Sequence, residues 1–260
     1  MQYAASNKAF SVVYQTGMTE QLVNRIYPLS CRSVVVCDPV DAALVVGSSQ
    51  NEVEIRSSLS NNINYNVVKR RSGGGAVLVL PGKQIWIDVF IPKEDPLYVE
   101  DILEAPLWLG QLWSKTINSV YNKDNTEVYR GRLIGSLSKL ICFSGLGPGE
   151  VLLEGQKIVG ISQRRIRSGT WFYTMLDLYD TQLQLYDLLN IRSSVKTLQE
   201  NNKMLLASKK HHNLQNTFEQ AITDNLRYKD MFEKTSFIFL RTLINKSIYI
   251  YIWKYSISQA

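Results

Sequence analysis

The chain has 260 residues, 45% of them hydrophobic and 20% charged, a composition typical of one large globular domain. Its net charge of +6 is modest and spread out, which favours an acidic protein or an anionic ligand as partner and disfavours nucleic acid. The three cysteines lack metal-like spacing, so they argue against a disulfide framework or a zinc site and indicate reduced, cytoplasmic thiols. The N-terminus does not have the pattern of a signal peptide, and no apolar run is long enough to span a membrane.

The first part of the chain predicts a short helix followed by a β-meander. Apolar residues recur on one helical face over residues 19–26, and Pro28 closes this helix. Alternating or apolar runs predict strands at residues 33–37, 42–46, 66–70, 76–80 and 84–91. The glycines at positions 73 to 75 would then lie at one end of the meander.

The second part predicts a helix and then a hairpin. Pro106 opens a run with helical spacing of apolar residues, a position where the missing N–H of proline costs nothing. Residues 139–143 are strand-like, and the runs 150–153 and 156–163 would form a hairpin that turns at Glu154 and Gly155. Residues 231–260 are a tail to which the sequence assigns no role.

Eight residues between the third and fourth predicted strands have the composition of an anion-binding loop. Glycines allow positive φ and let a ligand lie on the backbone, while arginine offers a planar fork of donors to phosphate or carboxylate. A glycine-rich hairpin beside an exposed basic strand is the structural alternative. These residues, called the glycine segment below, are Arg70, Arg71, Ser72, Gly73, Gly74, Gly75, Ala76 and Val77.

Two further residues are candidates for chemistry, each with a structural alternative. Lys157 stands at a strand start beside a glycine turn, where a lysine is usually just solvated. Cys142 stands between Ile141 and Phe143, where a cysteine is often a buried small apolar residue. The residue types alone leave both alternatives open.

Three segments occur in an order that resembles lipoate-protein ligases and related protein acyltransferases. They are residues 45–51, the glycine segment and residues 155–163, and the resemblance covers roughly residues 42–178. It implies an α+β fold with a mixed, largely antiparallel central sheet flanked by helices, of the biotin/lipoate-protein ligase catalytic-domain type. We expect this domain to occupy residues 1–230, with no separate accessory domain.

The resemblance also implies an activity and its site. In the ligase branch, lipoate and ATP with Mg²⁺ give lipoyl-adenylate, and a lysine of a carrier domain then attacks the acyl carbon. Arg70 matches an arginine beside the adenylate, and Lys157 matches a lysine beside the phosphate and the acyl carbonyl. Gly160 and Ser162 would complete the pocket wall. The breadth of the resemblance favours this ligase reaction.

The implied partners are the lipoyl domains of 2-oxoacid dehydrogenase E2 subunits or the glycine cleavage H protein. An acidic carrier of this kind would meet a basic rim, although a solvated basic face explains the same residues equally well. The rim residues are Arg71, Arg164, Arg165 and Arg167.

Departures from the ligase pattern open two alternatives. Leu78, Val79 and Leu80 replace an aromatic-His-Asp continuation, and Tyr173 stands where a histidine is usual, which puts ATP use in doubt. Cys142, Glu150 and Lys157 instead reproduce the layout of cysteine-dependent octanoyltransferases, which need no ATP and take octanoyl from acyl carrier protein as a thioester. A non-catalytic protein that binds lipoyl domains is the alternative from another class.

Overall fold

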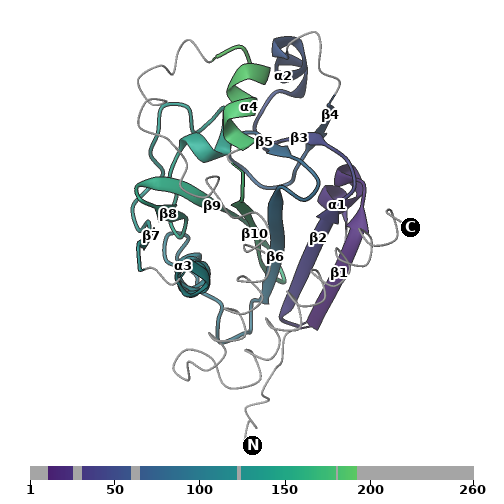
Figure 1. The fold of residues 1–260 in the computed structure, drawn as a ribbon. Coiled ribbons are helices and arrows are strands. Elements are labelled where there is room, and N and C mark those ends of the chain that lie inside the picture. Colours follow the sequence, from purple (N-terminus) through teal and green to yellow (C-terminus); the bar gives the residue numbers. More distant parts are fainter. Residues whose placement is uncertain (1–10, 26–30, 60–64, 122–123, 180, 192–260) are drawn as a thin grey trace, which may run out of the picture.

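The computed structural model describes residues 11–25, 31–59, 65–121, 124–179 and 181–191. The tail at residues 231–260, and the end of the predicted domain before it, lie outside these residues. A seven-stranded sheet forms the centre of the molecule, in the order β1-β2-β6-β10-β9-β8-β7 (Figure 1). Its strands are β1 (Ser11–Gly17), β2 (Ser33–Pro39), β6 (Gln84–Pro92), β7 (Thr126–Val128), β8 (Val151–Leu153), β9 (Gln156–Ile166) and β10 (Gly169–Asp177).

The large sheet is mixed but mostly antiparallel, as the sequence predicts. Strand β1 runs parallel to β2, and every other neighbouring pair is antiparallel. Strands β8 and β9 form the expected hairpin, and its turn residues Glu154 and Gly155 have φ values of 52° and 80°. Positive φ at two consecutive turn residues matches the right-handed twist of the strands that they join. Strand β9 continues beyond the predicted end at residue 163, so Arg164 and Arg165 belong to it.

A second, three-stranded sheet overturns the predicted meander. Strand β3 (Ala43–Val46) lies between β4 (Asn66–Lys69), to which it is parallel, and β5 (Val77–Val79), to which it is antiparallel. Because every residue of β3 is buried, this strand takes a partner on both sides. The glycine segment therefore crosses the end of β3 from β4 to β5 and does not turn a hairpin.

Successive side chains of the large sheet point to opposite faces, and different helices pack on the two faces. Helix α3 (Leu107–Tyr121) packs Leu109, Trp113 and Ile117 on one face of the large sheet, against Ile87 and Val89 among others. The side chains that point the other way from the same sheet pack with Leu22 of helix α1 (Thr19–Asn24). Helices α2 (Glu52–Ser58) and α4 (Thr181–Leu188) lie beside the small sheet at the top of Figure 1.

Two details of the helices differ from the sequence predictions. Helix α1 ends at Asn24, and Ile26 lies outside the described residues. Helix α2 begins in a stretch that carried no prediction, where the Asn51 side chain accepts a hydrogen bond from the Val53 N–H at 3.1 Å and caps the helix. None of the helices within the described ranges is long and apolar enough to cross a membrane.

The predicted strand at residues 139–143 is wrong. Ile141 makes only a single bridge with Ala76, and Cys142–Ser144 forms a short 3₁₀ helix, η1. The carbonyls of Cys142 and Gly145 accept hydrogen bonds from the Lys157 ammonium. These carbonyls are therefore turned towards a side chain, which explains why this apolar run does not extend a sheet.

Candidate active site

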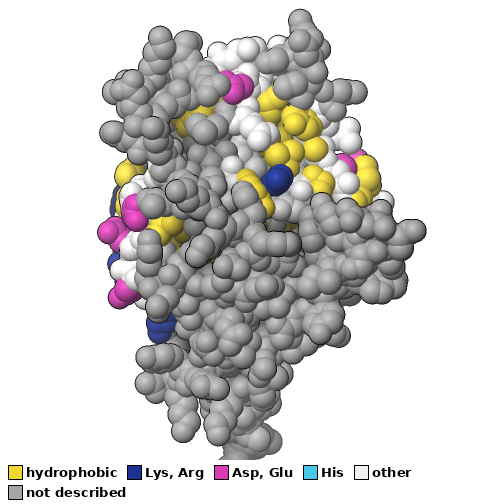
Figure 2. Space-filling model, viewed as in Figure 1, with side chains coloured by type: hydrophobic (Ala, Val, Ile, Leu, Met, Phe, Trp, Pro, Cys, Tyr) yellow, Lys and Arg dark blue, Asp and Glu magenta, His cyan; other side chains and the backbone are white. Residues whose placement is uncertain are grey.

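A cavity of about 70 Å³ lies between the two sheets. Its floor comes from the large sheet through Trp86, Asp88, Tyr173 and Met175, and its other walls come from the glycine segment and from η1. On the face seen in Figure 2, hydrophobic side chains gather over the small sheet around a basic side chain. Valines 23, 45, 77 and 79 make much of the lining apolar, as a site for an aliphatic chain requires.

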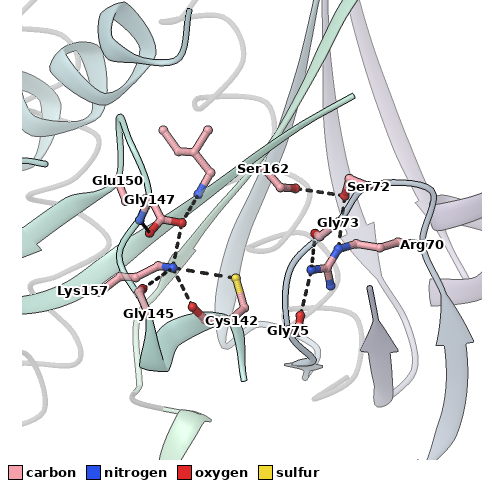
Figure 3. Close-up of polar contacts among 11 residues, drawn as sticks. Arg70, Ser72, Gly73, Gly75, Cys142, Gly145, Gly147, Glu150, Lys157 and Ser162 are labelled. Carbon is pink, nitrogen blue, oxygen red and sulfur yellow. Dashed lines mark hydrogen bonds and ion pairs between the residues drawn. The ribbon is translucent and has the colours of Figure 1, made fainter. Parts of the chain in front are cut away.

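Arg70 braces the glycine segment from within (Figure 3). Its guanidinium donates to the carbonyls of Gly73 at 2.9 Å, Gly75 at 2.8 Å and Val45 at 3.3 Å, and its Nε donates to Ser72 Oγ at 3.2 Å. Burial lowers the pKa of Arg70, and the charge of Cys142 opposes this effect. Arg70 thus lines the cavity while it holds the backbone of the loop.

The three glycines have different physical roles. A Cβ on Gly75 would lie 2.6 Å from the backbone of Ile141 and 2.7 Å from the Cys142 nitrogen, so Gly75 permits the close contact that seats Cys142. Gly74 has a φ of 97°, a conformation that favours glycine. A Cβ on Gly73 would meet nothing within 4 Å. Only Gly73 therefore leaves the open approach that the sequence analysis expected of all three.

The segment at residues 45–51 supports the glycine segment directly. A Cβ on Gly47 would lie 1.9 Å from the Gly74 carbonyl oxygen, so the two loops interlock only because Gly47 has no side chain. Ser72 is buried and shares a hydrogen bond of 3.0 Å with the hydroxyl of Ser162 on β9, which joins the glycine segment to the large sheet. Ala76 is also buried, and its carbonyl accepts the Cys142 N–H at 3.0 Å.

Lys157 is not a solvated strand-edge lysine. Its side chain is 4% exposed, and its ammonium lies 2.7 Å from Glu150 Oε1, 2.7 Å from the Cys142 carbonyl and 3.0 Å from the Gly145 carbonyl. The same nitrogen is 3.8 Å from Cys142 Sγ and lies over the ring of Phe143. The folded chain therefore brings Lys157 and Cys142 together, 15 positions apart in the sequence.

Glu150 is the buried counter-charge of Lys157. Its side chain is 5% exposed, and besides the lysine it accepts N–H bonds from Gly147 at 2.7 Å and from Ile161 at 3.2 Å. Burial raises the pKa of Glu150, and Lys157 together with the two backbone donors opposes this shift. In the sequence, Glu150 was noted only as part of a family pattern. An acidic residue next to an apolar strand was the available signal, because buried carboxylates are rare unless paired.

Cys142 and Cys37 occupy contrasting environments. Cys142 is half-buried and lines the cavity, whereas Cys37 is buried in the core with Trp86 and Phe90. Burial raises the pKa of the Cys37 thiol well above its usual value, and Asp88 adds to this shift. The description of a buried, inert cysteine therefore fits Cys37 better than Cys142.

A buried polar network lies in the floor of the cavity, and the sequence analysis missed it. Asp88 is fully buried, forms an ion pair with Arg25 and accepts a hydrogen bond from Trp86 Nε1 at 2.8 Å. Burial raises the pKa of Asp88, while Arg25 and Trp86 oppose the shift. Burial also raises the pKa of Tyr173, the residue in the place of the usual histidine. A single acid within the apolar run of β6 was the signal for this network.

The basic rim is divided. Arg71 is exposed at the cavity and donates to the Asn24 carbonyl at 3.2 Å. Arg164 hydrogen-bonds Tyr173 on the cavity face of β9, but the side chain of Arg165, the next residue, bonds to Tyr98 and Val99 instead. Because side chains alternate along a strand, these two arginines cannot contribute to one rim.

Of the predicted site residues, half line the cavity directly. These are Arg70, Arg71, Val77, Cys142, Gly160 and Ser162. The others do not line it, although most of them contact the residues that do. They are Ser72, Gly73, Gly74, Gly75, Ala76 and Lys157.

Comparison with known proteins agrees with this fold. Residues 12–233 match the model of the lipoyl protein ligase A/B catalytic domain, and the chain belongs to this family. The octanoyltransferase LipM of Bacillus anthracis is 27% identical over 172 residues, which is 64% of this chain and 60% of that protein. LipM of Bacillus cereus is 27% identical over 151 residues, 56% of this chain and 53% of that protein. The chain thus spans less than two thirds of these relatives.

Solved structures agree with the family at the level of the fold. Lipoate-protein ligase A bound with ATP has a TM-score of 0.54 at 12% identity, covering 92% of this chain and 95% of that chain. Ta0514, a putative lipoate protein ligase from T. acidophilum, has a TM-score of 0.50 at 15% identity with the same coverage. These likenesses confirm the predicted catalytic-domain fold, and at such identities they show nothing finer.

Proposed function

We propose that this protein transfers an octanoyl group to the lysine of a lipoyl carrier domain through a thioester on Cys142, without ATP. The observation that carries the proposal is the position of the Cys142 thiol, in the cavity lining and 3.8 Å from the Lys157 ammonium. A cation beside a thiol favours the thiolate, which is the nucleophilic form. The similarity to LipM octanoyltransferases supports the same chemistry.

The reaction has two halves. In the first, the Cys142 thiolate attacks the carbonyl of an acyl thioester, the donor's carbon–sulfur bond breaks, and the donor thiol leaves with the proton that Cys142 gave up. In the second, the neutral amine of the acceptor lysine attacks the Cys142 thioester. The amide bond forms, Cys142 leaves as thiolate, and the proton of the amine passes to solvent or to the sulfur. Lys157 stabilises the charge on sulfur in both halves.

The residues of the cavity fit ATP and Mg²⁺ poorly. Asp88 is the carboxylate in the lining, and Arg25 and Trp86 already bind it. No cluster of potential metal ligands occurs among the side chains that the structure describes. Arg70, which the family resemblance assigns to the adenylate, donates to the protein's own carbonyls, and Val79 lines the cavity where polar groups were expected. These observations support a donor that needs no activation by ATP.

Octanoyl acyl carrier protein is the proposed donor, and the lipoyl domains of 2-oxoacid dehydrogenase E2 subunits or the glycine cleavage H protein are the proposed acceptors. Both assignments come from the family. The apolar cavity lining supports an aliphatic acyl group, and the net charge of +6 supports acidic protein partners.

A two-donor experiment tests the proposal. The protein is incubated with an apo-lipoyl domain and either octanoyl acyl carrier protein or lipoate with ATP and Mg²⁺, and the acceptor is weighed by intact mass spectrometry. We expect an octanoyl adduct from the first donor and, without acceptor, an octanoyl group on Cys142 that hydroxylamine releases. An adduct only from lipoate and ATP would contradict the thioester route in favour of the ligase. If neither donor gives an adduct, the enzyme proposal fails, and a non-catalytic protein that binds lipoyl domains is the remaining alternative.

The matched variants Cys142→Ser and Cys37→Ser separate chemistry from packing. Cys142→Ser should lose transfer with little change in melting temperature. Cys37→Ser should melt at a lower temperature, since moving a hydroxyl into this apolar core costs about 1–3 kcal/mol, yet keep the transfer rate of the wild type. Transfer by Cys142→Ser at the wild-type rate would exclude this thiol as the nucleophile.

A further inference from the structure

Glu150 has more contacts than a simple counter-charge needs. Its two carboxylate oxygens bind Lys157 Nζ, the Gly147 N–H and the Ile161 N–H, at 2.7, 2.7 and 3.2 Å (Figure 3). Gly147 belongs to the loop after η1, and Ile161 belongs to β9. One buried carboxylate therefore joins the strand that carries Lys157 to the loop that follows Cys142.

The contacts of Lys157 complete the same assembly. An ammonium has three N–H bonds, and here Glu150, the Cys142 carbonyl and the Gly145 carbonyl accept them at 2.7, 2.7 and 3.0 Å. Two of these acceptors are neutral carbonyls in a buried site, where a lone ammonium is strongly disfavoured. Glu150 is the carboxylate among the described contacts of this ammonium, and its charge offsets that of the lysine. Lys157 thus depends on Glu150 for both its charge and its place beside the sulfur.

We infer that Glu150 is a positioning residue for acyl transfer, which acts by holding Lys157 as a charged ammonium against η1 and Cys142. This inference rests on the proposed function for its place in the reaction, but its geometry does not depend on the acyl donor. Glu150 itself does not line the cavity, so it does not meet the acyl group. Its effect on the sulfur passes through Lys157, and removal of Glu150 should therefore slow transfer no further once Lys157 is gone.

A double-mutant cycle of Glu150→Gln and Lys157→Met tests this dependence. We expect each single variant to slow transfer about a hundredfold, the usual effect of removing a group that stabilises charge at a reacting centre. The double variant should transfer no more slowly than Lys157→Met, because both substitutions remove the same effect. Losses that multiply in the double variant would show that Glu150 acts independently of Lys157 and would overturn the inference.

Melting temperatures measured on the same variants need no substrate. Each single variant leaves a buried charge or its partner uncompensated and should melt below the wild type, whereas the double variant removes both charges and should recover most of the loss. Glu154→Gln, an exposed glutamate in the turn of the same hairpin, is the matched control and should behave as the wild type. Equal and additive losses would argue against a coupled pair.

Alkylation of Cys142 by iodoacetamide distinguishes failure of this inference from failure of the proposed function. The modified peptide is followed by mass spectrometry between pH 6 and 9. If Glu150 holds the cation beside the sulfur, Glu150→Gln should alkylate Cys142 as slowly as Lys157→Met, while Glu150→Asp, which keeps the charge, should react faster than Glu150→Gln. If Glu150→Gln reacts at or above the wild-type rate, Glu150 does not position a thiolate-stabilising cation, whatever the acyl donor proves to be.

Discussion

Two cations lie on either side of Cys142, and they differ in the partners that hold them (Figure 3). Lys157 pairs with the carboxylate of Glu150, whereas Arg70 donates to the carbonyls of Val45, Gly73 and Gly75 and to the hydroxyl of Ser72. The Lys157–Glu150 pair is nearly neutral as a unit. The hydrogen-bond acceptors of Arg70 are neutral, and its site is part-buried, where charge acts over a longer range than in water.

Two basic side chains, a lysine and an arginine, therefore serve different purposes in one site. The carboxylate of Glu150 holds the Lys157 ammonium 3.8 Å from the sulfur of Cys142. Arg70 fixes the loop whose Gly75 touches the Cys142 backbone, and at the same time contributes a net positive charge to the cavity. The glycine segment therefore positions the Cys142 backbone as well as lining the cavity.

The largest effect is expected from disturbing the close contact between Gly75 and the backbone of Cys142. Gly75→Ala places a Cβ within 2.6 Å of the Ile141 backbone and 2.7 Å of the Cys142 nitrogen, and these backbone atoms cannot move without shifting Cys142. We expect transfer to fall by about a hundredfold or more, since a displacement near 1 Å can cost that much in a positioned reaction. The measurement is the rate of Cys142 acylation from octanoyl acyl carrier protein.

Gly73→Ala is the matched control for Gly75→Ala. Its Cβ would meet nothing within 4 Å, so the melting temperature should stay at the wild-type value. A Gly75→Ala variant as active as Gly73→Ala would show that the contact between the glycine segment and Cys142 does not matter for catalysis.

Removal of the Arg70 charge should have the next largest effect. Arg70→Met loses both the bracing hydrogen bonds and the charge, and we expect Cys142 acylation to slow by roughly a hundredfold. Arg70→Lys keeps the charge but not the planar fork and should be affected less. Arg71→Met, at the exposed neighbouring position, should change the rate by less than about threefold. Equal acylation rates for Arg70→Met and Arg71→Met would contradict a specific role for Arg70 in the reaction.

The smallest expected effect is a change in the pH dependence of stability when Asp88, in the floor of the cavity, is replaced. Because burial raises the pKa of Asp88, the folded protein binds more protons than the unfolded chain from about pH 4 up to the raised value. Stability should therefore fall as pH rises through this window. Asp88→Asn should make the dependence of melting temperature on pH shallower, by a few degrees across the window.

The control for this measurement is Glu100→Gln, at an exposed position. It should leave the slope unchanged. Burial also raises the pKa of Glu150, so Glu150→Gln should flatten the curve in the same direction. A steeper slope in Asp88→Asn would contradict the sign of the Asp88 shift.

Local patterns in the sequence were sufficient to predict much of the molecule. Apolar runs predicted β2 and β6, helical spacing predicted α3, and Glu154 with Gly155 predicted the hairpin turn, because these features depend on residues close together in the chain. The order of three motifs identified the family, which the match over residues 12–233 confirms. The pairing of β4 and β5 with β3 was missed, since strand partners are set by burial between distant segments.

The residue types of the site can be read from the amino-acid sequence, whereas the contacts of those residues exist only in the folded chain. Lys157 beside a glycine turn looked like a solvated lysine, and Glu150, Gly145 and Cys142 become its partners only when η1 folds against β9. Asp88 and Arg25 form an ion pair although they lie far apart in the chain. Charges find their partners through packing, because the cost of burying an ion depends on every group that the fold brings around it.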